Sequence, residues 1–511
     1  MKKSLLFCCL VFSSFLPLNA WFFGDSWADV QERCRNAVVQ VFNDFSGFSF
    51  SEPYKEGEVS QCCGSGFLID ESGLIITNYH VVANAKRVQI QVPSIGKNRF
   101  DVEVVSISPE NDLALIKLCD EGIKKLKDNF QKVPFLRFGS SDKMRRGSAT
   151  LALGFPLGQE HLKGAQGVVS GWETVTFDIV GFNSICLQTT SPINNGNSGG
   201  PTVNKEGWVV GINFAAFSDA QNVGYMIPID SVKAVIEEMK KTKIVRRLFC
   251  GVTVQLATPS LLKFLKCPKG LGGVYVVDLC PEGFAGRMGV EKGDLICEVN
   301  GKKIDRNGLV SVGWSDEPVP LLEVISRLPL GADIEVGVFR SGKKLKLKEK
   351  KKNTNVPPVR NLFFGYEKID YEVFGAGFVV MELSKSHVRA FEKHNPLLAK
   401  YLLMEVCTGR PALIVTYVIP TCEASATGQC IRMGDLIKSV GDVETNTLKD
   451  FRREVERSLK NDEFVVLKNH VGVLGVFDSK KVLKDSFSLV KRLRISKENS
   501  VSLKVAEETK T

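Results

Sequence analysis

The sequence predicts a mainly β protein whose first half forms a barrel or a sandwich. From Ala37 to about Met239, short apolar runs alternate with glycine turns. The run 88–92 (Val-Gln-Ile-Gln-Val) alternates apolar and polar residues, as in a half-buried strand. Glycine and proline are frequent, at 45 and 20 residues, which is typical of turn-rich β proteins. Many short strands at regular spacing favour a barrel or sandwich over alternating β/α units, and the helical spacing of 231–240 predicts a closing helix. Buried-strand patterns also occur at 74–77 and 113–116.

Length and composition limit the class of protein. At roughly 150 residues per domain, a chain of 511 residues has room for about three domains. A hydrophobic fraction of 44% and a charged fraction of 24% exclude a disordered, collagenous or fibrous chain. The 14 cysteines are too few for a disulfide scaffold. The net charge of +10 is modest at this length and does not by itself indicate a nucleic-acid partner.

The first 20 residues predict a secretory signal peptide. Two lysines precede the uncharged apolar run 4–16, and Ala20 offers a small residue at a cleavage point. The run is too short to span a bilayer of ~30 Å as a helix, and an uncut membrane anchor is the alternative. We therefore expect an exported protein, in the periplasm or secreted, with no stable membrane insertion after cleavage.

A repeated tetrapeptide indicates two related modules in the second half of the chain. Gly-Asp-Leu-Ile occurs at 293–296 and again at 434–437, each time as a tight turn feeding a strand. The spacing exceeds one compact module, so we expect an insertion in the second copy, with a helical part at 385–407. The lysine-rich run 343–352 predicts an exposed edge strand followed by a linker. Its nucleic-acid alternative lacks interleaved aromatic residues.

The sharpest chemical signal is a glycine-rich loop around one serine, Ser198. Residues 194–201 read Asn-Asn-Gly-Asn-Ser-Gly-Gly-Pro. Glycine permits backbone conformations that can turn several N–H groups toward one point beside the hydroxyl. Acyl transfer needs this combination, a nucleophile with amide donors where an oxyanion will form. A plain glycine turn between strands is the alternative.

A serine hydroxyl needs a base, and the base needs a carboxylate that orients it. Among five histidines, His80 stands out because it follows an apolar strand at the start of a helical turn. Asp112 directly precedes the apolar run 113–116 and is the best candidate for a buried carboxylate. Taken singly, a structural histidine and an ordinary turn aspartate are the alternatives.

In combination, these residues resemble the HtrA/Deg family of chymotrypsin-like serine proteases. The resemblance implies two antiparallel six-stranded barrels with the active site between them. His80 would act as general base and then general acid, Asp112 would orient it, and Ser198 would form the acyl-enzyme. The N–H groups of Gly196 and Ser198 would form the oxyanion hole, helped by the position of Asn197. No metal or cofactor is expected. The segments that carry the resemblance are 64–67, 77–82, 112–115, 196–201, 211–213 and 222–228.

The same resemblance gives a substrate pocket. Its floor would be Pro192, with Ile193 beside it, and no acid is present to pair with lysine or arginine. The opposite wall would be Asn213, Phe214 and Ala215, where the substrate backbone would add as an extra strand. We expect cleavage after small or medium aliphatic residues, with Phe214 limiting the size.

The two later modules resemble PDZ domains. In the first, 248–252 (Leu248, Phe249, Cys250, Gly251, Val252) looks like the loop that captures a peptide's terminal carboxylate through backbone N–H groups. The second, with 375–380 and 482–496, is closer to plant-type Deg proteases, and we expect it to serve assembly or regulation instead of peptide capture. The expected division is a signal peptide at 1–20, a protease domain at 21–243, a first PDZ domain at 244–352, a linker at 353–360, and a diverged PDZ-like domain at 361–511.

The resemblance implies an ATP-independent serine endopeptidase that degrades unfolded or damaged exported polypeptides and reads exposed C-termini. A chaperone-like binding scaffold and a regulatory protease with one dedicated substrate are the competing functions. Family trimers are joined by N-terminal aromatic residues, so Trp21, Phe22, Phe23 and Trp27 predict a homo-oligomer, a trimer or a multiple of three. Packing of these residues on the barrel is the alternative.

The cysteines are less informative. Two bridges are conceivable, one joining Cys34 to Cys62 or Cys63 and one joining Cys422 to Cys430. We expect neither to form, and we expect Cys119, Cys186 and Cys297 to be buried thiols.

Overall fold

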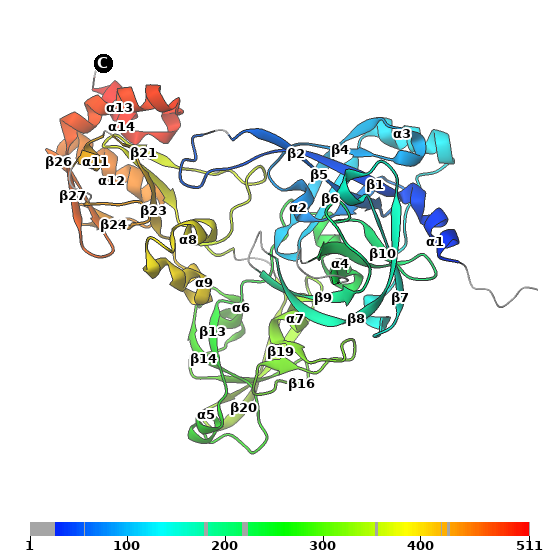
Figure 1. Cartoon of the computed structure of the whole chain (residues 1–511). Helices are drawn as coiled ribbons and strands as arrows, with labels where there is room; N and C mark the ends of the chain where they lie inside the picture. Colours follow the sequence, from blue (N-terminus) through cyan, green and yellow to red (C-terminus); the bar gives the residue numbers. More distant parts are fainter. Residues whose placement is uncertain are drawn as a thin grey trace, which may run out of the picture.

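Two closed six-stranded β-barrels form the first half of the computed structural model (Figure 1). The structure describes residues 26–55, 57–177, 182–216, 223–352, 356–420, 422–426 and 430–509. The predicted signal peptide and Trp21, Phe22 and Phe23 lie outside these ranges. The first barrel runs in the order β1-β2-β3-β6-β5-β4 and the second in the order β10-β11-β12-β9-β8-β7. The strand pattern alone leaves a barrel or a sandwich open, and the two six-stranded barrels that the family resemblance implies are confirmed.

The elements of this half have the following bounds. The first barrel comprises β1 (Val38–Ser46), β2 (Val59–Leu68), β3 (Leu74–Thr77), β4 (Ala85–Gln91), β5 (Arg99–Ser108) and β6 (Leu113–Leu118). The second comprises β7 (Ala149–Gly154), β8 (Lys163–Phe177), β9 (Phe182–Thr189), β10 (Pro201–Val203), β11 (Val209–Ala216) and β12 (Gly224–Pro228). The helices are α1 (Trp27–Cys34), α2 (Tyr79–Val82), α3 (Asp120–Phe130) and α4 (Ile229–Met239).

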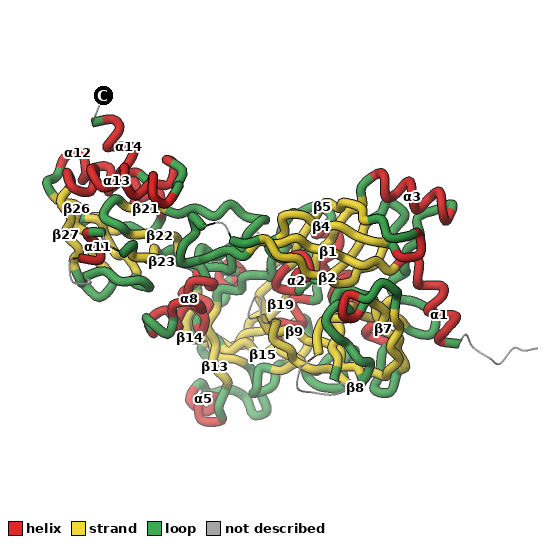
Figure 2. The backbone as a smooth tube through the Cα atoms, turned by 45° about the horizontal axis from the view of Figure 1, so that its top comes forward, coloured by secondary structure: helices red, strands yellow, loops and turns green. Residues whose placement is uncertain are grey.

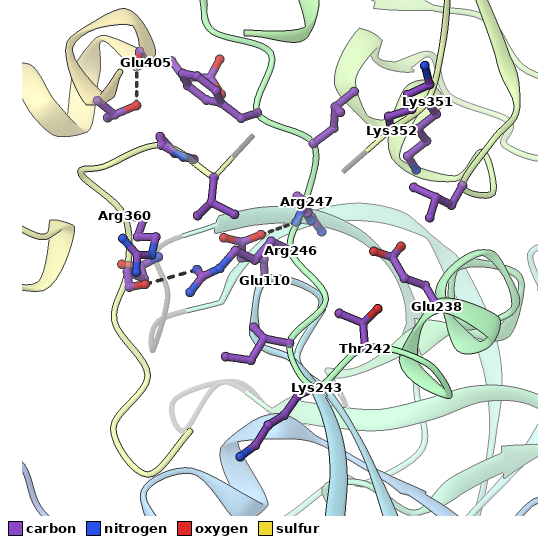
Figure 3. A pocket seen from close by; sticks show the side chains of 18 of the residues that line it. Glu110, Glu238, Thr242, Lys243, Arg246, Arg247, Lys351, Lys352, Arg360 and Glu405 are labelled. Carbon is purple, nitrogen blue, oxygen red and sulfur yellow. Dashed lines mark hydrogen bonds between the residues drawn. The ribbon is translucent and has the colours of Figure 1, made fainter. Parts of the chain in front are cut away.

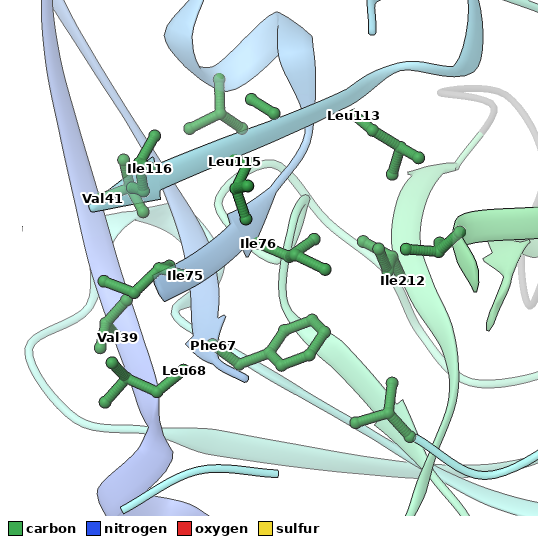
Figure 4. Close-up of a cluster of buried hydrophobic side chains, with 14 of the residues drawn as sticks. Val39, Val41, Phe67, Leu68, Ile75, Ile76, Leu113, Leu115, Ile116 and Ile212 are labelled. Carbon is green, nitrogen blue, oxygen red and sulfur yellow. The ribbon is translucent and has the colours of Figure 1, made fainter. Parts of the chain in front are cut away.

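Apolar side chains from neighbouring strands fill the first barrel (Figure 4). Phe67, Ile75 and Leu115 are fully buried there, and Ile212 of the second barrel belongs to the same cluster. Each such side chain contributes about 1.5–3 kcal/mol when it leaves water. The alternation read from 88–92 is confirmed, because Val88 and Ile90 both point into this core. One continuous core thus fixes the two barrels against each other, and the loops between them carry the candidate site.

The third sheet holds the first PDZ-like module, in the order β13-β14-β15-β19-β20. The lysine-rich run forms β20 at the sheet's edge, as predicted, and alternate residues are exposed. Its lysines form ion pairs with glutamates of the neighbouring strands. Lys346 binds Glu335 of β19 at 2.7 Å, and Lys344 binds Glu298 of β15, one strand further, at 2.6 Å. The strands are β13 (Val252–Leu256), β14 (Val274–Leu279), β15 (Leu295–Val299), β16 (Lys302–Lys303), β17 (Leu309–Val310), β18 (Val319–Pro320), β19 (Asp333–Arg340) and β20 (Lys343–Lys350), and the helices are α5 (Pro259–Phe264), α6 (Phe284–Met288) and α7 (Leu321–Ser326).

The fourth sheet runs β21-β22-β23-β24-β26-β27, and helices α12 to α14 gather against it near the C-terminus (Figure 2). The helical insertion predicted at 385–407 is present as α8, α9 and α10. The strands are β21 (Glu372–Phe374), β22 (Phe378–Glu382), β23 (Leu413–Val418), β24 (Leu436–Val440), β25 (Val443–Glu444), β26 (Phe464–Asn469) and β27 (Leu474–Asp478). The helices are α8 (Lys385–Phe391), α9 (Lys400–Leu403), α10 (Glu405–Thr408), α11 (Glu423–Ala426), α12 (Leu448–Asn461), α13 (Ser479–Leu493) and α14 (Val501–Glu508).

The segment before the fourth sheet packs on the first barrel. Phe363 is 3% exposed and belongs to the barrel's core cluster. The Tyr366 hydroxyl donates to the Val82 carbonyl oxygen at 2.7 Å, and the rings of Tyr79 and Phe363 lie 5.6 Å apart. Residues 361–366 thus lie against α2, the helix that holds His80. The second module is therefore packed against the two-barrel half through its own N-terminal segment.

All twelve cysteines in the described ranges are free, so neither conceivable bridge is formed. Cys186 and Cys297 are buried, as predicted, whereas Cys119 is half-buried. Burial raises the pKa of Cys34 to about 11, which keeps this thiol protonated and unreactive at neutral pH. Within the described ranges, none of the helices combines the length and the apolar character needed to cross a membrane.

Candidate active site

His80 and Asp112 form a hydrogen-bonded pair at the edge of the first barrel. His80 lies in α2, which directly follows β3, and Asp112 directly precedes β6, the neighbour of β3. The His80 Nδ1 atom lies 2.8 Å from Asp112 Oδ2, and the His80 backbone N–H donates to Asp112 Oδ1 at 2.9 Å. Because a carboxylate can only accept, Nδ1 carries the proton and Nε2 is left as the basic nitrogen.

The position of Asp112 is itself fixed by its neighbours. The residue has a left-handed backbone, with φ 50°, and is 4% exposed. The Asn78 amide donates to the Asp112 carbonyl oxygen at 2.9 Å. The preceding residues, Glu110 and Asn111, both bind Arg247. The Glu110 carboxylate accepts from the Arg247 backbone N–H (Figure 3). Asn111 Oδ1 accepts from Arg247 Nε at 3.0 Å. The segment leading into the third sheet therefore supports the Asp112 turn.

Two opposing effects act on the pKa of His80. Burial lowers the pKa, because it penalises the charged ring, whereas the charge of Asp112 and its hydrogen bond raise it. The net pKa lies above the ordinary 6.5. Such a base gains a proton readily, as general-base chemistry requires.

The loop around Ser198 depends on two glycines. Gly196 has φ 97°, and a Cβ there would lie 2.3 Å from the Phe155 carbonyl oxygen. Gly199 has φ 86°, and a Cβ there would lie 2.2 Å from the Ser65 carbonyl oxygen. Both positions require glycine for conformation and for space. The tight loop places Ser198 at the surface between the barrels.

Ser65 of β2 fixes the position of this loop through hydrogen bonds. The sequence alone does not predict this role. The Ser65 side chain is fully buried. Its backbone N–H donates to the Ser198 carbonyl oxygen at 2.8 Å, and its hydroxyl donates to the Gly196 carbonyl oxygen at 2.6 Å. The hydroxyl also accepts from the Phe155 N–H at 3.0 Å. One residue of the first barrel thus locks the serine loop of the second.

On either side of Asn197, the N–H groups of Gly196 and Ser198 have no acceptor in the described part of the chain. The Asn195 carbonyl oxygen accepts from the Leu157 N–H at 2.6 Å, so the N–H of Gly196, on the far side of the same trans peptide, points the other way. The Asn197 N–H donates to the Asn194 carbonyl oxygen at 2.9 Å and is not available as a donor. Two donors therefore remain for a developing oxyanion.

The Ser198 hydroxyl donates to the Phe214 carbonyl oxygen at 2.8 Å. Among the described residues, His80 and Ser198 share no hydrogen bond. Phe214 lies at a bulge, where the register of β11 with β12 shifts between Asn213 and Ala215. Bulges re-aim backbone groups beside active sites, and this one turns a carbonyl toward the serine. The serine hydroxyl is thus held against β11 instead of the imidazole.

The residues predicted for the substrate pocket are brought together only in part. Pro192 is exposed, and Ile193 is buried against Gly224, where a Cβ would lie 2.9 Å from Ile193 Cδ1. The Phe214 ring lies 6.2 Å from the His80 ring and 4.6 Å from that of Phe177. Phe177, at the end of β8, had no sequence signal.

Asn213 does not line the pocket, contrary to expectation. It is fully buried, its amide donates to the Leu153 carbonyl oxygen at 2.9 Å, and its Oδ1 accepts from the Thr202 hydroxyl at 2.6 Å. Its backbone N–H and carbonyl bind Gly200 and Gly199. With every polar group in use, Asn213 supports the serine loop. Ala215 lies in β11 opposite Tyr225.

The predicted carboxylate loop of the first PDZ-like module is anchored through its carbonyl groups. The carbonyl oxygens of Phe249, Cys250 and Gly251 accept from the N–H groups of Phe284, Ala285 and Cys280 at 3.0, 3.0 and 2.7 Å. In a trans peptide the N–H lies opposite the carbonyl, so the N–H groups of Cys250, Gly251 and Val252 face away from this anchor. Leu248 packs against the module's core.

Comparison with known proteins finds similarity to serine proteases. A family described as "Trypsin-like peptidase domain" matches residues 64–212. The "Probable periplasmic serine endoprotease DegP-like" of Rickettsia conorii is 27% identical over 412 residues, 79% of this chain and 74% of that protein. The protein of the same name in Chlamydia trachomatis is 30% identical over 312 residues, 60% of this chain and 58% of that one.

Further matches extend beyond bacteria. "Serine protease HTRA1" of Xenopus tropicalis is 30% identical over 312 residues, 59% of this chain and 64% of that protein. Several relatives at 30–32% identity are thus matched over only 52% to 64% of their own length. A solved structure, "HtrA-type protease AlgW with tripeptide", matches with a TM-score of 0.49 and 26% identity, over 64% of this chain and 96% of that one. The chain thus contains a trypsin-like peptidase domain and is similar in sequence to HtrA/DegP serine endoproteases.

Proposed function

We propose that the chain is an ATP-independent serine endopeptidase that degrades unfolded or damaged exported polypeptides. The observation that carries this proposal is the hydrogen-bonded His80–Asp112 pair, whose carboxylate is buried. The pair lies across the barrel interface from the serine loop, in which the N–H groups of Gly196 and Ser198 have no acceptor among the described residues. A structural histidine has no need of a buried carboxylate behind it, and a plain turn has no need of two vacant donors. A hydrolase that passes through an acyl-enzyme needs both.

In this mechanism Ser198 Oγ attacks the scissile carbonyl while His80 Nε2 takes the hydroxyl proton. Asp112 keeps the imidazole oriented and stabilises the imidazolium that forms. The N–H groups of Gly196 and Ser198 stabilise the oxyanion of the tetrahedral intermediate. His80 then protonates the leaving amine, and water hydrolyses the acyl-enzyme by the same steps. Before the first step, the Ser198 hydroxyl must leave the Phe214 carbonyl oxygen and turn toward His80.

The side chains around Ser198 favour substrates with small or medium aliphatic residues at the cleaved position. Pro192 and Ile193 offer no charge, and Phe214, whose ring is tilted against that of Phe177, limits the depth of the pocket. The backbone at Ala215 is the proposed partner for an added substrate strand. A trypsin-like preference is not expected, because no carboxylate is available to pair with lysine or arginine.

The proposed organisation keeps a protease domain at 21–243 and PDZ-like domains at 244–352 and 361–511. The names of the bacterial relatives support export to the periplasm, and the predicted signal peptide agrees with it. We also propose a homo-oligomer, a trimer or a multiple of three. Trp27 packs on the shared core of its own two barrels, with Lys205 Nζ 4.1 Å from its ring centroid, so the oligomer contact would rest on Trp21 and Phe23.

Substitution of the nucleophile tests the proposal. Ser198→Ala should lower casein cleavage by a factor on the order of 10⁶, and Asp112→Asn by about 10⁴, because the latter leaves His80 in the wrong tautomer. Because the pKa of His80 is raised, activity should fall with decreasing pH from a point above the ordinary imidazole range. Unchanged casein cleavage by Ser198→Ala would contradict the proposed mechanism, whereas no cleavage by either form would favour the scaffold function. A screen of many unfolded proteins then separates broad degradation from a dedicated substrate.

A further inference from the structure

The carboxylate loop of the first PDZ-like module already holds a carboxylate, that of Glu405. The Gly251 N–H donates to Glu405 Oε2 at 3.0 Å and the Val252 N–H at 3.4 Å, and the Cys250 N–H also faces this carboxylate. Glu405 begins α10, in the helical insertion of the second module, 154 positions along the chain. A side chain of one module therefore fills the loop of the other.

The loop is built to hold an anion at this point. Gly251 has φ 68°, and a Cβ there would lie 2.8 Å from the Gly283 Cα, so only glycine fits. With three carbonyls anchored on the other side, three successive N–H groups converge outward. Consecutive N–H groups of this kind form an anion-binding concavity. A peptide's terminal carboxylate and the Glu405 side chain present the same pair of oxygens to it.

The approach of α10 is close enough to need a glycine of its own. A Cβ at Gly409, the residue that ends α10, would lie 2.6 Å from Cys280 Sγ. Cys280 is also the residue whose N–H anchors the Gly251 carbonyl. The helix thus rests directly on the structure that forms the loop, and the Glu405 contact is part of a fitted interface.

Opposing effects act on the pKa of Glu405, which lies above its ordinary value. Burial raises the pKa of Glu405, while the loop N–H groups and the Lys385 ammonium lower it in part. Glu405 and Lys385 line a cavity of about 680 Å³ between the protease half and the two modules (Figure 3). The same cavity is lined by Arg246, Arg247 and Arg360. A basic environment of this kind suits either an internal or an incoming carboxylate.

Next to the filled loop, the strand that a peptide would join remains open. Among the described strands, β13 is the edge of its sheet and pairs with β14 alone. Val254 and Leu256 on this strand are 43% and 55% exposed. An exposed edge strand can accept an added strand through its free backbone groups. A peptide C-terminus can therefore approach β13, but Glu405 occupies the N–H groups that would bind the peptide's terminal carboxylate.

We propose that Glu405 is an internal ligand of the first PDZ-like module, and that a polypeptide with a free C-terminal carboxylate displaces it as the peptide pairs with β13. Binding of such a partner then requires α10 to leave the loop. The apparent affinity for the partner is reduced by the fraction of molecules in which Glu405 is bound. This competition does not depend on peptidase activity.

The test measures peptide binding in the full-length Ser198→Ala protein, so that no peptide is cut. A fluorescein-labelled decapeptide ending in valine, with a free carboxylate, is titrated by fluorescence anisotropy against four forms: unmodified Glu405, Glu405→Gln, Glu405→Asp and the control Glu392→Gln. Glu392 lies in the same insertion without a contact to the loop. We expect Glu405→Gln to bind about tenfold more tightly than the unmodified form. Glu405→Asp should also gain affinity, because it keeps the charge but cannot reach the loop, and Glu392→Gln should gain none.

A C-terminally amidated peptide separates carboxylate capture from a general effect of charge. It should bind weakly to every form and gain nothing from Glu405→Gln. Gly409→Val, which forces α10 away from Cys280, should raise the affinity for the free-carboxylate peptide by the same route. Equal affinities in the unmodified, Glu405→Gln and Gly409→Val proteins would overturn the proposal, as would an equal gain for the amidated peptide.

Discussion

The two PDZ-like modules repeat one core turn but differ at the strand that could bind a peptide. In both, a left-handed glycine, Gly293 with φ 96° or Gly434 with φ 89°, precedes a buried strand. In the first module the strand after the carboxylate loop, β13, is a free edge. In the second, the corresponding strand β22 is paired on its outer side by β21. The core of the module is therefore repeated while its binding edge is not.

The short strand β21 and the C-terminal helices close that edge. A tight turn joins β21 to β22, with the Gly377 N–H donating to the Phe374 carbonyl oxygen at 2.8 Å. The Glu372 carboxylate accepts from the Val501 N–H at 2.6 Å, which fixes α14 over β21. A peptide strand cannot add to β22 while β21 is there. This arrangement supports the prediction that the second module serves assembly or regulation, and Glu405 is a contact through which it could do so.

The largest expected difference between the modules concerns the aspartate of the repeated turn. Asp294 is fully buried and receives two Arg340 hydrogen bonds, both of 2.7 Å. Asp435 is only half-buried and is bound by Asn469 Nδ2 at 3.0 Å. Arg340→Ala should lower the free energy of unfolding of the first module by about 3–5 kcal/mol, because it leaves the buried Asp294 carboxylate without its cation. Asn469→Ala should cost the second about 1.5–3 kcal/mol.

Amide hydrogen exchange, resolved by module, measures both losses in the full chain, where a single unfolding transition is not expected. Each substitution should speed exchange in its own module. Equal losses in the two modules would mean that the two turns are energetically alike in spite of their different burial.

The core turns, strands and helical insertion could be predicted from local sequence, because each depends on residues close together in the chain. The Gly-Asp-Leu-Ile repeat, the edge strand β20 and the helix α4 are examples. The burial of Asn213 could not be predicted, since it depends on the register of β10, β11 and the serine loop. The Glu405 contact joins residues 154 positions apart, and no pattern in either segment indicates it.

In the candidate site, too, some features can be predicted from local sequence and others depend on how the strands pair. His80, Asp112 and Ser198 each stand in a recognisable local context. The direction of the Ser198 hydroxyl does not, because it depends on a bulge at Phe214 that only the pairing of β11 with β12 creates.

A smaller expected difference between the modules is the effect of low pH on their stability. The first module, at 244–352, contains no histidine, whereas His387 of the second is fully buried and its Nδ1 accepts from the Ser384 N–H at 3.1 Å. Burial lowers the pKa of His387 to about 3, from an ordinary 6.5. Below pH 6.5, His387 is protonated in the unfolded chain but stays neutral in the folded module. The free energy of unfolding of this module therefore falls as the pH falls toward 3. The loss is about 1.4 kcal/mol per pH unit.

Hydrogen exchange at pH 7 and pH 5 measures this contribution as a difference between variants, because Glu372 of the same module, whose pKa burial raises to about 7, acts in the opposite direction. On going from pH 7 to pH 5, the second module should lose less stability in His387→Gln than in the unmodified chain, and His394→Gln, at an exposed position of the same insertion, should behave like the unmodified chain. The same pH dependence in His387→Gln and in the unmodified chain would contradict this assignment.

The most direct test of the proposed catalytic site is covalent labelling. The full-length protein, incubated with a fluorophosphonate probe and an unfolded polypeptide, is digested, and the labelled residue is located by mass spectrometry. We predict the label on Ser198, its loss in Ser198→Ala, and much slower labelling in His80→Ala. A folded protein that leaves Ser198 unlabelled, or that labels this serine equally fast without the imidazole of His80, would contradict the account.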